Sequence, residues 1–296
     1  MLIYCSAIFC VGSYAAGQTF HEVACPQTPI ELKELLRPGS TAIPLLSAHR
    51  GGAGRGLPEN CLATFENTLL DGFTLLEVDP RRTSDGQFVL HHDPSLTRTT
   101  TGSGLLSTTA WQQVQQLQLK DVDGNVTHLG IPTLKDAIQW ASGKCVLVLD
   151  SKDVSVAERV SLITDLKAEA TTMMLIYSLA DAQECYRLNP KIMMEYAITT
   201  QRQFDQFDTS GIPWSNIVAF VGHSKPTNDE LIRAIHARGA ACMAGTSRYL
   251  DKQLIGADEA TLQKLRTEYR SLLEMGIDII ETDTPHEVRR LLNTQL

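Results

Sequence analysis

The sequence predicts an α/β protein whose strands and helices alternate and close into a (β/α)8 barrel. Short apolar runs of strand length alternate along the chain with amphipathic stretches of helix length. An alternation of this kind is typical of a parallel sheet covered by helices, and eight repeats are the number that a closed barrel needs. The apolar runs lie at 42–49, 74–79, 144–150, 173–178, 191–197, 216–222, 239–245 and 277–283.

The stretches between these runs have helical periodicity. Apolar residues recur at every third or fourth position in 59–72, 156–170, 228–239 and 259–276. Glycine is the last residue of three of these stretches, as is common where a helix ends. A chain of 296 residues exceeds the usual size of one domain, but barrels of this type form single domains of about 250 residues.

One pair of extended segments does not fit the alternation. In 75–93, "LLEVDPRRTSDGQFVLHHD", two period-2 segments flank Asp85-Gly86, which predicts a hairpin with a two-residue turn. Such a turn joins only antiparallel strands. The returning strand is therefore expected to stand above the C-terminal rim of the barrel, where barrel enzymes carry their catalytic residues.

The predicted turn also sets which side chains meet. It places Asp79 opposite His92, and Glu77 shares the face of Asp79 because strand side chains alternate. The adjacent His91 should then point away. The alternative interpretation is a solvated hairpin whose charges have no function.

The expected domain organisation is simple. Residues 1–17 form an apolar run that ends in small residues, which predicts a signal peptide and export to the periplasm or the exterior. No Lys or Arg precedes the run, so a buried terminal segment of a cytoplasmic protein is the alternative. Residues 18–40 form a polar N-terminal connection, and 41–296 form one barrel domain. An insertion rich in Thr, Gly and Gln, at about 97–132, should lie over the rim.

Composition excludes several classes of protein. The formal net charge of −8 argues against a nucleic-acid binder, which needs a basic surface. The apolar N-terminal run is too short to cross a bilayer, so no stable membrane insertion is expected. The remaining cysteines have no spacing typical of a disulfide framework or a zinc site, and buried packing is their expected role. They are Cys25, Cys61, Cys145, Cys185 and Cys242.

Acids, cations and imidazoles gather where the predicted strands end. Carboxylates suit a hard divalent cation such as Mg²⁺ or Ca²⁺, and Arg or Lys suits phosphate oxygens. With two imidazoles as acid and base, the set has what phosphodiester hydrolysis needs. The residues are His49, Arg50, Glu59, Glu77, Asp79, His92, Asp150 and Lys152.

Simpler roles compete for some of these positions. A histidine at a strand end is commonly a hydrogen-bonded structural group, and Lys152 could merely pair with Asp150 or Asp153. Glu59 is expected beside the site rather than on the metal, and capping of the next helix is its alternative role. The other histidines have no evident partner and are not expected in the site. They are His128, His223, His236 and His286.

The motifs, taken in order, resemble the glycerophosphodiester phosphodiesterase family over about 240 residues. They read "AHRGG", "PEN", "EVD", "SDGQFVLHHD", "LTRTTTGSG", "IPTL" and "IETDTP". The resemblance implies a barrel of the phosphatidylinositol-phospholipase-C-like type. It also implies catalytic roles for His49 and His92, phosphate binding by Arg50 and Lys152, and a metal site formed by Glu77, Asp79 and Asp150.

Three positions depart from the family pattern. Asp150 stands where the family has Glu and is one methylene shorter. Cys61 replaces the usual Thr after "PEN". "MAGTSR" stands where an aromatic pair is common, which affects the pocket for the leaving alcohol.

The resemblance therefore implies metal-dependent hydrolysis of a glycerophosphodiester, such as glycerophosphocholine or glycerophosphoethanolamine, to sn-glycerol 3-phosphate and an alcohol. Two alternatives are a phospholipase-D-like enzyme acting on lysophospholipid or sphingomyelin, and a non-catalytic binder of phosphorylated ligands. The sequence does not specify the alcohol, the metal or the oligomeric state.

Overall fold

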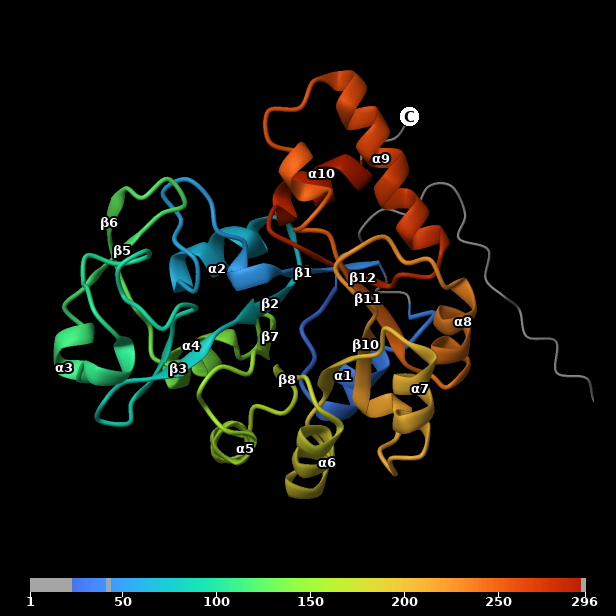
Figure 1. Cartoon of the computed structure of the whole chain (residues 1–296), viewed down its shortest axis with the longest axis horizontal. Coiled ribbons are helices and arrows are strands. Elements are labelled where there is room, and N and C mark those ends of the chain that lie inside the picture. The colour runs from blue at the N-terminus through green and yellow to red at the C-terminus, as the bar shows by residue number, and fades with distance from the viewer. Residues whose placement is uncertain (1–22, 41–43, 294–296) are drawn as a thin grey trace, which may run out of the picture.

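The fold is a closed barrel of eight parallel strands in the part of the chain that the structure describes (Figure 1). This is a computed structural model, which describes residues 23–40 and 44–293. The predicted signal peptide lies outside these residues. The order around the barrel is β1-β12-β11-β10-β9-β8-β7-β2. The bounds are β1 Leu45–Ala48, β2 Leu75–Val78, β7 Val146–Leu149, β8 Thr172–Ile176, β9 Met194–Ala197, β10 Ile217–Phe220, β11 Ala241–Gly245 and β12 Ile279–Thr282.

Helices cover the outside of the barrel, and each predicted apolar run supplies one barrel strand, so the predicted fold class is confirmed. Helix starts follow local rules: Ser155 caps α5 by accepting from the backbone of Glu158, whose side chain bonds back to the cap. No helix in the described ranges is both long and apolar enough to cross a bilayer. The helices are α1 Pro29–Leu35, α2 Leu62–Thr68, α3 Trp111–Val114, α4 Leu134–Ala141, α5 Val156–Asp165, α6 Leu179–Leu188, α7 Gln201–Asp208, α8 Asp229–Ala237, α9 Glu259–Glu274 and α10 Pro285–Asn293.

Alternate residues of each barrel strand enter two different cores. One set packs against the surrounding helices, and the other forms a separate apolar cluster inside the barrel. Leu32 and Leu36 belong to this inner cluster and are 0% and 1% exposed. Residues 18–40, predicted as a polar connection, therefore include a helix, α1, whose apolar side packs against the interior of the barrel.

The hairpin forms, but the predicted register is wrong by one residue. β3 (Pro80–Arg82) pairs with β4 (Phe88–Leu90) so that Arg81 stands opposite Val89. The turn contains three residues instead of two, because Thr83 and Gln87 form the closing pair: the Thr83 N–H donates to the Gln87 carbonyl at 3.0 Å. Gly86 takes the left-handed conformation that such a turn needs, with φ 88°.

Asp79 therefore stands opposite His91 rather than His92, and its carbonyl accepts from the His91 N–H at 2.8 Å. His91 is nevertheless turned away, as predicted. It is buried, and its Nε2 bonds to the Ser95 carbonyl at 3.0 Å. β4 ends at Leu90 and the ladder bond from His91 is the last, so strand alternation no longer decides where the side chain of His92 points.

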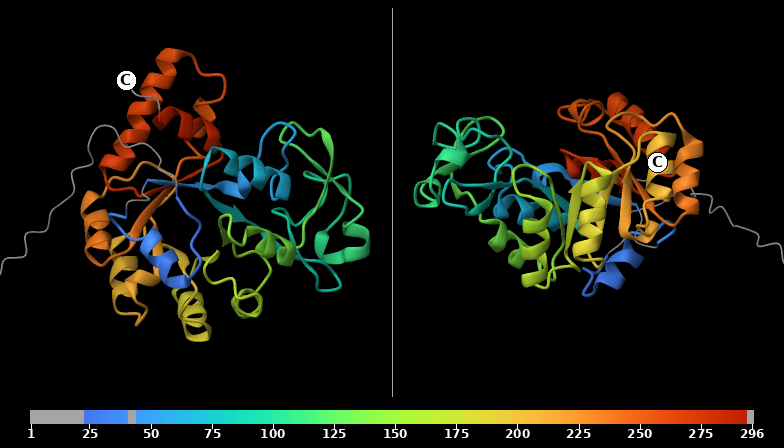
Figure 2. Two further views of the ribbon diagram at one scale, coloured as in Figure 1. Left: turned by 180° about the vertical axis from the view of Figure 1, so that it is seen from behind. Right: turned by 60° about the horizontal axis from the view of Figure 1, so that its bottom comes forward.

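The insertion stands to one side of the barrel beside the hairpin, as both Figure 1 and Figure 2 show. It contains α3 and a second hairpin, β5 (Gln118–Lys120) and β6 (Val126–Gly130), and no strand of the barrel. Leu106, Val114 and Leu119 of the insertion pack with Val89 of β4 in a small core of their own. The insertion is thus anchored to the element that carries His92 to the rim.

Candidate active site

The chain makes a sharp turn directly after β1, at His49-Arg50-Gly51. Arg50 has φ 52°, which is costly for a residue with a side chain and is common at functional sites. Gly51 has φ 84°, and a Cβ there would lie 2.2 Å from Cε1 of Phe65, so no side chain fits. The turn aims the Arg50 N–H at the Glu77 carboxylate, 2.8 Å from Oε2.

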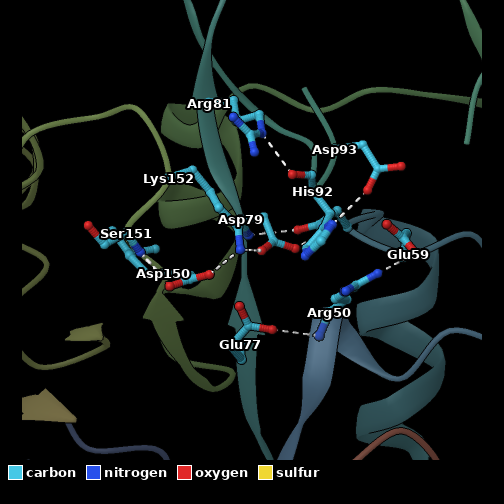
Figure 3. A network of polar contacts seen from close by, with 12 residues as sticks. Arg50, Glu59, Glu77, Asp79, Arg81, His92, Asp93, Asp150, Ser151 and Lys152 are labelled. Carbon is cyan, nitrogen blue, oxygen red and sulfur yellow. Dashed lines mark hydrogen bonds and ion pairs between the residues drawn. The ribbon is translucent and has the colours of Figure 1, made fainter. Parts of the chain in front are cut away.

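Three carboxylates form an acidic cluster at the C-terminal ends of β2 and β7 (Figure 3). Ligand atoms of Glu77, Asp79 and Asp150 all lie within 4.8 Å of one another, and all three residues are buried. The predicted metal ligands are therefore brought together, although Asp150 is more than 70 positions from Glu77 and Asp79 in the sequence.

Neighbouring residues hold two of these carboxylates in place. Asn60 donates to Asp79 Oδ2 at 2.6 Å and accepts from the Asp79 N–H at 2.9 Å. Asp150 Oδ1 accepts from the Tyr177 hydroxyl at 2.7 Å. Lys152 Nζ lies 2.5 Å from Asp150 Oδ2 and 3.2 Å from Asp79 Oδ1. Lys152 thus does pair with Asp150, but Asp153 pairs with Arg81 instead.

The chemistry of the cluster fits a hard divalent cation. Burial raises the pKa of Glu77 well above its ordinary value, and repulsion from Asp79 and Asp150 adds to this effect. Burial also opposes ionisation of Asp150, but Lys152 outweighs it and lowers the pKa of Asp150. The ammonium of Lys152 thus pairs with two of the three acids, Asp79 and Asp150. Glu77 has no such partner, so its ionisation costs free energy that a bound cation would offset.

His92 reaches the cavity at the head of a chain of ion pairs. Its Nδ1 lies 2.7 Å from Asp93 Oδ1, and Arg98 of the insertion bridges Asp93 and Glu59 at 2.6 and 2.8 Å. Glu59 in turn lies 3.2 Å from Arg50 Nη1. Glu59 therefore supports Arg50 from the side. It does not cap α2, whose N-cap is Cys61.

His49 has a matching carboxylate partner. Its Nδ1 lies 2.7 Å from Asp283 Oδ1, just beyond the end of β12. Burial alone would lower the pKa of His49, but the hydrogen bond with Asp283 and the negative charge of Glu281 outweigh burial and raise it. Each predicted catalytic histidine therefore has its Nδ1 held by an aspartate, which leaves Nε2 for a ligand.

One cavity of about 380 Å³ collects most of these side chains. Asp79, 1% exposed, belongs to the acidic cluster but not to the cavity wall, and Glu59 also lies outside the wall. The predicted site residues on the wall are His49, Arg50, Glu77, His92, Asp150 and Lys152.

Sequence reasoning missed four residues on the same wall: Glu195, His223, Glu281 and Asp283. Glu281 and Asp283 stand at the end of the last predicted strand, so the rule that identified Glu77 could have found them. Glu195 is a lone acid within an apolar strand, which is itself a signal. His223 was predicted to have no partner, but its Nδ1 faces Glu281 Oε1 at 3.7 Å.

That prediction is also wrong for two other histidines, which pair with acids remote in sequence. His236 Nε2 lies 2.8 Å from Asp278, and His286 Nδ1 lies 2.6 Å from Asp71. Neither histidine lines the cavity.

Known structures share this fold, and known sequences resemble this chain. A glycerophosphoryl diester phosphodiesterase from Parabacteroides distasonis ATCC 8503 is 40% identical, with a TM-score of 0.84 over 91% of this chain and 93% of that one. An Oleispira antarctica phosphodiesterase, solved with the product sn-glycerol-3-phosphate, shares the fold at 22% identity and a TM-score of 0.62, over 85% of this chain and 98% of that one. An uncharacterised Bacillus subtilis protein, YqiK, is 26% identical over 84% of this chain and 98% of its own length.

The parallel barrel carries acids, imidazoles and cationic side chains at its C-terminal rim, which is the arrangement of the class of barrel phosphodiesterases. Residues 49–287 match the glycerophosphoryl diester phosphodiesterase family, and the chain belongs to that family. The resemblance drawn from the motifs is confirmed.

Proposed function

We propose that this protein hydrolyses glycerophosphodiesters to sn-glycerol 3-phosphate and an alcohol with the help of a divalent cation. The observation that carries the proposal is that two histidines, each held by an aspartate, share a cavity with Arg50, Lys152 and the acidic cluster. Acid and base thus stand beside groups that can bind one phosphodiester. A non-catalytic binder would not need two oriented imidazoles.

The chain supplies most of the chemistry with its own groups. Arg50 offers a guanidinium to phosphate oxygens, and Glu59 holds that guanidinium from the other side. Lys152 adds a second positive charge. One histidine removes the proton of the attacking hydroxyl, and the other protonates the leaving alcohol as its bond to phosphorus breaks. If water attacks, this step gives sn-glycerol 3-phosphate directly. If the glycerol 2-hydroxyl attacks, it gives a cyclic phosphate, which water then opens at the 2-oxygen to give sn-glycerol 3-phosphate.

The metal would be held by Glu77, Asp79 and Asp150, whose oxygens suit Mg²⁺, Ca²⁺ or Mn²⁺. When bound, such an ion withdraws charge from the phosphate and so favours attack at phosphorus.

A substrate panel tests the proposal directly. We expect the purified protein with Mg²⁺, Ca²⁺ or Mn²⁺ to release sn-glycerol 3-phosphate from several glycerophosphodiesters, measured with a coupled dehydrogenase assay. Lysophosphatidylcholine and sphingomyelin belong in the same panel. Turnover of these lipids alone, with no sn-glycerol 3-phosphate formed, would favour the phospholipase-D-like alternative.

Asp283 is expected to position His49, and Asp283→Asn tests this role. The kcat should fall by roughly 10- to 100-fold, the range seen when the partner that orients a metal-bound histidine is removed. Asp283 holds the pKa of His49 up. The variant should therefore lower that pKa and move the His49 limb of the pH–rate profile to lower pH.

Asp229→Asn is the control, because this exposed acid on α8 lies away from the cavity. A purely structural Asp283 would cost stability and leave the pH profile in place.

A further inference from the structure

Two glutamates point into the barrel. Apart from the effect of the Glu281 charge on the pKa of His49, neither has a role in the reaction described above. Met193 and Ile279 belong to the inner apolar cluster, so Glu195 and Glu281, two positions further along their strands, also face the interior. They are 2% and 3% exposed and line the same cavity as His49 and Lys152. The interiors of such barrels are normally filled by Val, Ile and Leu.

Both carboxyl groups lack a hydrogen-bond partner for one buried oxygen in the described structure: Oε2 of Glu195 and Oε1 of Glu281. Burial raises the pKa of Glu281 to about 7 and that of Glu195 well above its ordinary value. Buried polar atoms without partners are rare because they lose their bonds to water. Two of them on one cavity wall indicate a ligand.

Neither nearby imidazole gives these oxygens a hydrogen bond. His49 interacts with Glu281 through charge, but its Nδ1 is bonded to Asp283. His223 Nδ1 faces Glu281 Oε1 at 3.7 Å, which is beyond hydrogen-bond distance, and it makes no hydrogen bond. Burial lowers the pKa of His223 to about 4, so its ring is neutral near pH 7. Arg248 and Lys252 line the cavity too, but both are exposed to solvent, and neither is ion-paired with Glu195 or Glu281.

Gly245 keeps the space between these groups open. A Cβ at this position would lie 2.5 Å from His223 Nδ1 and 3.1 Å from Glu281 Oε1. Its φ is not in the left-handed region, so space rather than backbone conformation accounts for glycine here. β11 thus presents no side chain beside the unpartnered atoms.

The wall of the cavity therefore carries groups of opposite character. Arg50 and Lys152 line it, and so do the two carboxyl groups with unpartnered oxygens. A second metal ion fits poorly between Glu195 and Glu281, because the groups of three potential ligands within 4.8 Å, among the described residues, contain neither of them. The fitting ligand carries a phosphate and also a cation with hydrogens to donate.

We propose that Glu195 and Glu281 form a subsite for a primary ammonium group on the leaving alcohol, so that amino-alcohol diesters of glycerol phosphate are the preferred substrates. This inference rests on the proposed function. A primary ammonium offers three N–H donors to the unpartnered oxygens. A trimethylammonium offers none, so the ethanolamine diester should be preferred to the choline diester, and both to a neutral alcohol.

The test compares kcat/KM for glycerophosphoethanolamine, glycerophosphocholine and glycerophosphoglycerol. Wild-type protein should prefer the ethanolamine diester to the glycerol diester by at least about tenfold, as expected for charge-assisted hydrogen bonds. Glu195→Gln and Glu281→Gln keep the side-chain shape, and each should reduce that preference by about tenfold through KM. Turnover of the glycerol diester should change less than about twofold in Glu195→Gln. For Glu281→Gln the three substrates are compared at the pH optimum of that variant, because Glu281 also helps to raise the pKa of His49.

Two further variants sharpen the comparison. Gly245→Ala should reduce the same preference by filling the space beside Glu281. Glu230→Gln removes an exposed carboxylate from α8, away from the cavity, and should leave the preference unchanged. Circular dichroism of each variant confirms that it is folded.

Several results would overturn the inference while the proposed function stands. One is a wild type with equal kcat/KM for the three diesters. Another is an equal loss of kcat/KM for all three diesters in the variants, which would mean that the glutamates bind the shared glycerol. The third is the loss of one bound Mn²⁺ per protein in Glu281→Gln. If wild type cleaves no diester, the proposed function fails. Calorimetry with phosphoethanolamine then decides: binding about tenfold weaker in Glu281→Gln supports the subsite, and equal binding overturns it.

Discussion

Replacing His49 or His92 by alanine should lower kcat by about 10²–10⁴-fold, because each histidine is expected to transfer a proton in the rate-determining step. Substrate binding should largely survive, since Arg50, Lys152 and the cation hold the phosphate. Steady-state kinetics on the best diester of the panel, with KM and kcat reported separately, measure this effect.

The losses of kcat caused by the two substitutions should not multiply in the double variant. Groups that act on one transition state lose most of their combined effect with the first removal, so the double variant should fall short of the product of the single losses. His128→Ala is a suitable control, because this histidine lies on β6 of the insertion and not on the cavity wall. A variant of His49 or His92 with near-wild-type kcat would refute its role in proton transfer.

Chelation should abolish activity, and one hard divalent cation should restore it. Glu77, Asp79 and Asp150 hold three carboxylates within 4.8 Å in a buried cluster, and Lys152 compensates only part of their charge. Dialysis against EDTA followed by titration with Mg²⁺, Ca²⁺ and Mn²⁺ shows which ion restores turnover. Asp150 is shorter than the glutamate of the family pattern. The order in which the three ions restore turnover therefore shows how well the Asp150 carboxylate reaches ions of different size.

Metal binding can be measured without an activity assay. Equilibrium dialysis with Mn²⁺ should find about one ion per wild-type protein. Binding to Glu77→Gln should be at least about tenfold weaker, because losing a charged ligand should cost no less than losing a residue that only orients a ligand. Glu66→Gln is the control, since this exposed acid pairs with Lys144 on the outside of the barrel. Full turnover in excess EDTA, with no metal found by elemental analysis, would exclude a metal-dependent reaction.

Local patterns in the sequence were sufficient to predict the barrel. Strand and helix periodicities depend on residues a few positions apart, and each of the eight predicted runs became a strand of the barrel. The rule that barrel enzymes carry functional groups at strand ends then identified Glu77 and Asp150 as neighbours before any contact was known. These conclusions need only the order of the elements.

The hairpin shows where local reasoning became uncertain. Asp85-Gly86 correctly indicated a turn, but a pairing between Thr83 and Gln87 added one residue to it. Asp85 also accepts from the backbone N–H of Trp111 in the insertion, at 3.0 Å. One residue shifts a whole register, and the contacts that select the longer turn come in part from a distant segment.

Only the tertiary structure brought Asp283 to His49 and turned Glu195 and Glu281 into the same cavity. These pairings join strands that closure of the barrel places around one interior, across sequence separations of up to 234 positions. The sequence by itself determined which elements form and which ends carry polar groups, because those properties follow from short-range backbone and side-chain preferences. Which carboxylate meets which histidine depends on the curvature and register of the closed sheet, and those arise only when all eight strands pack together.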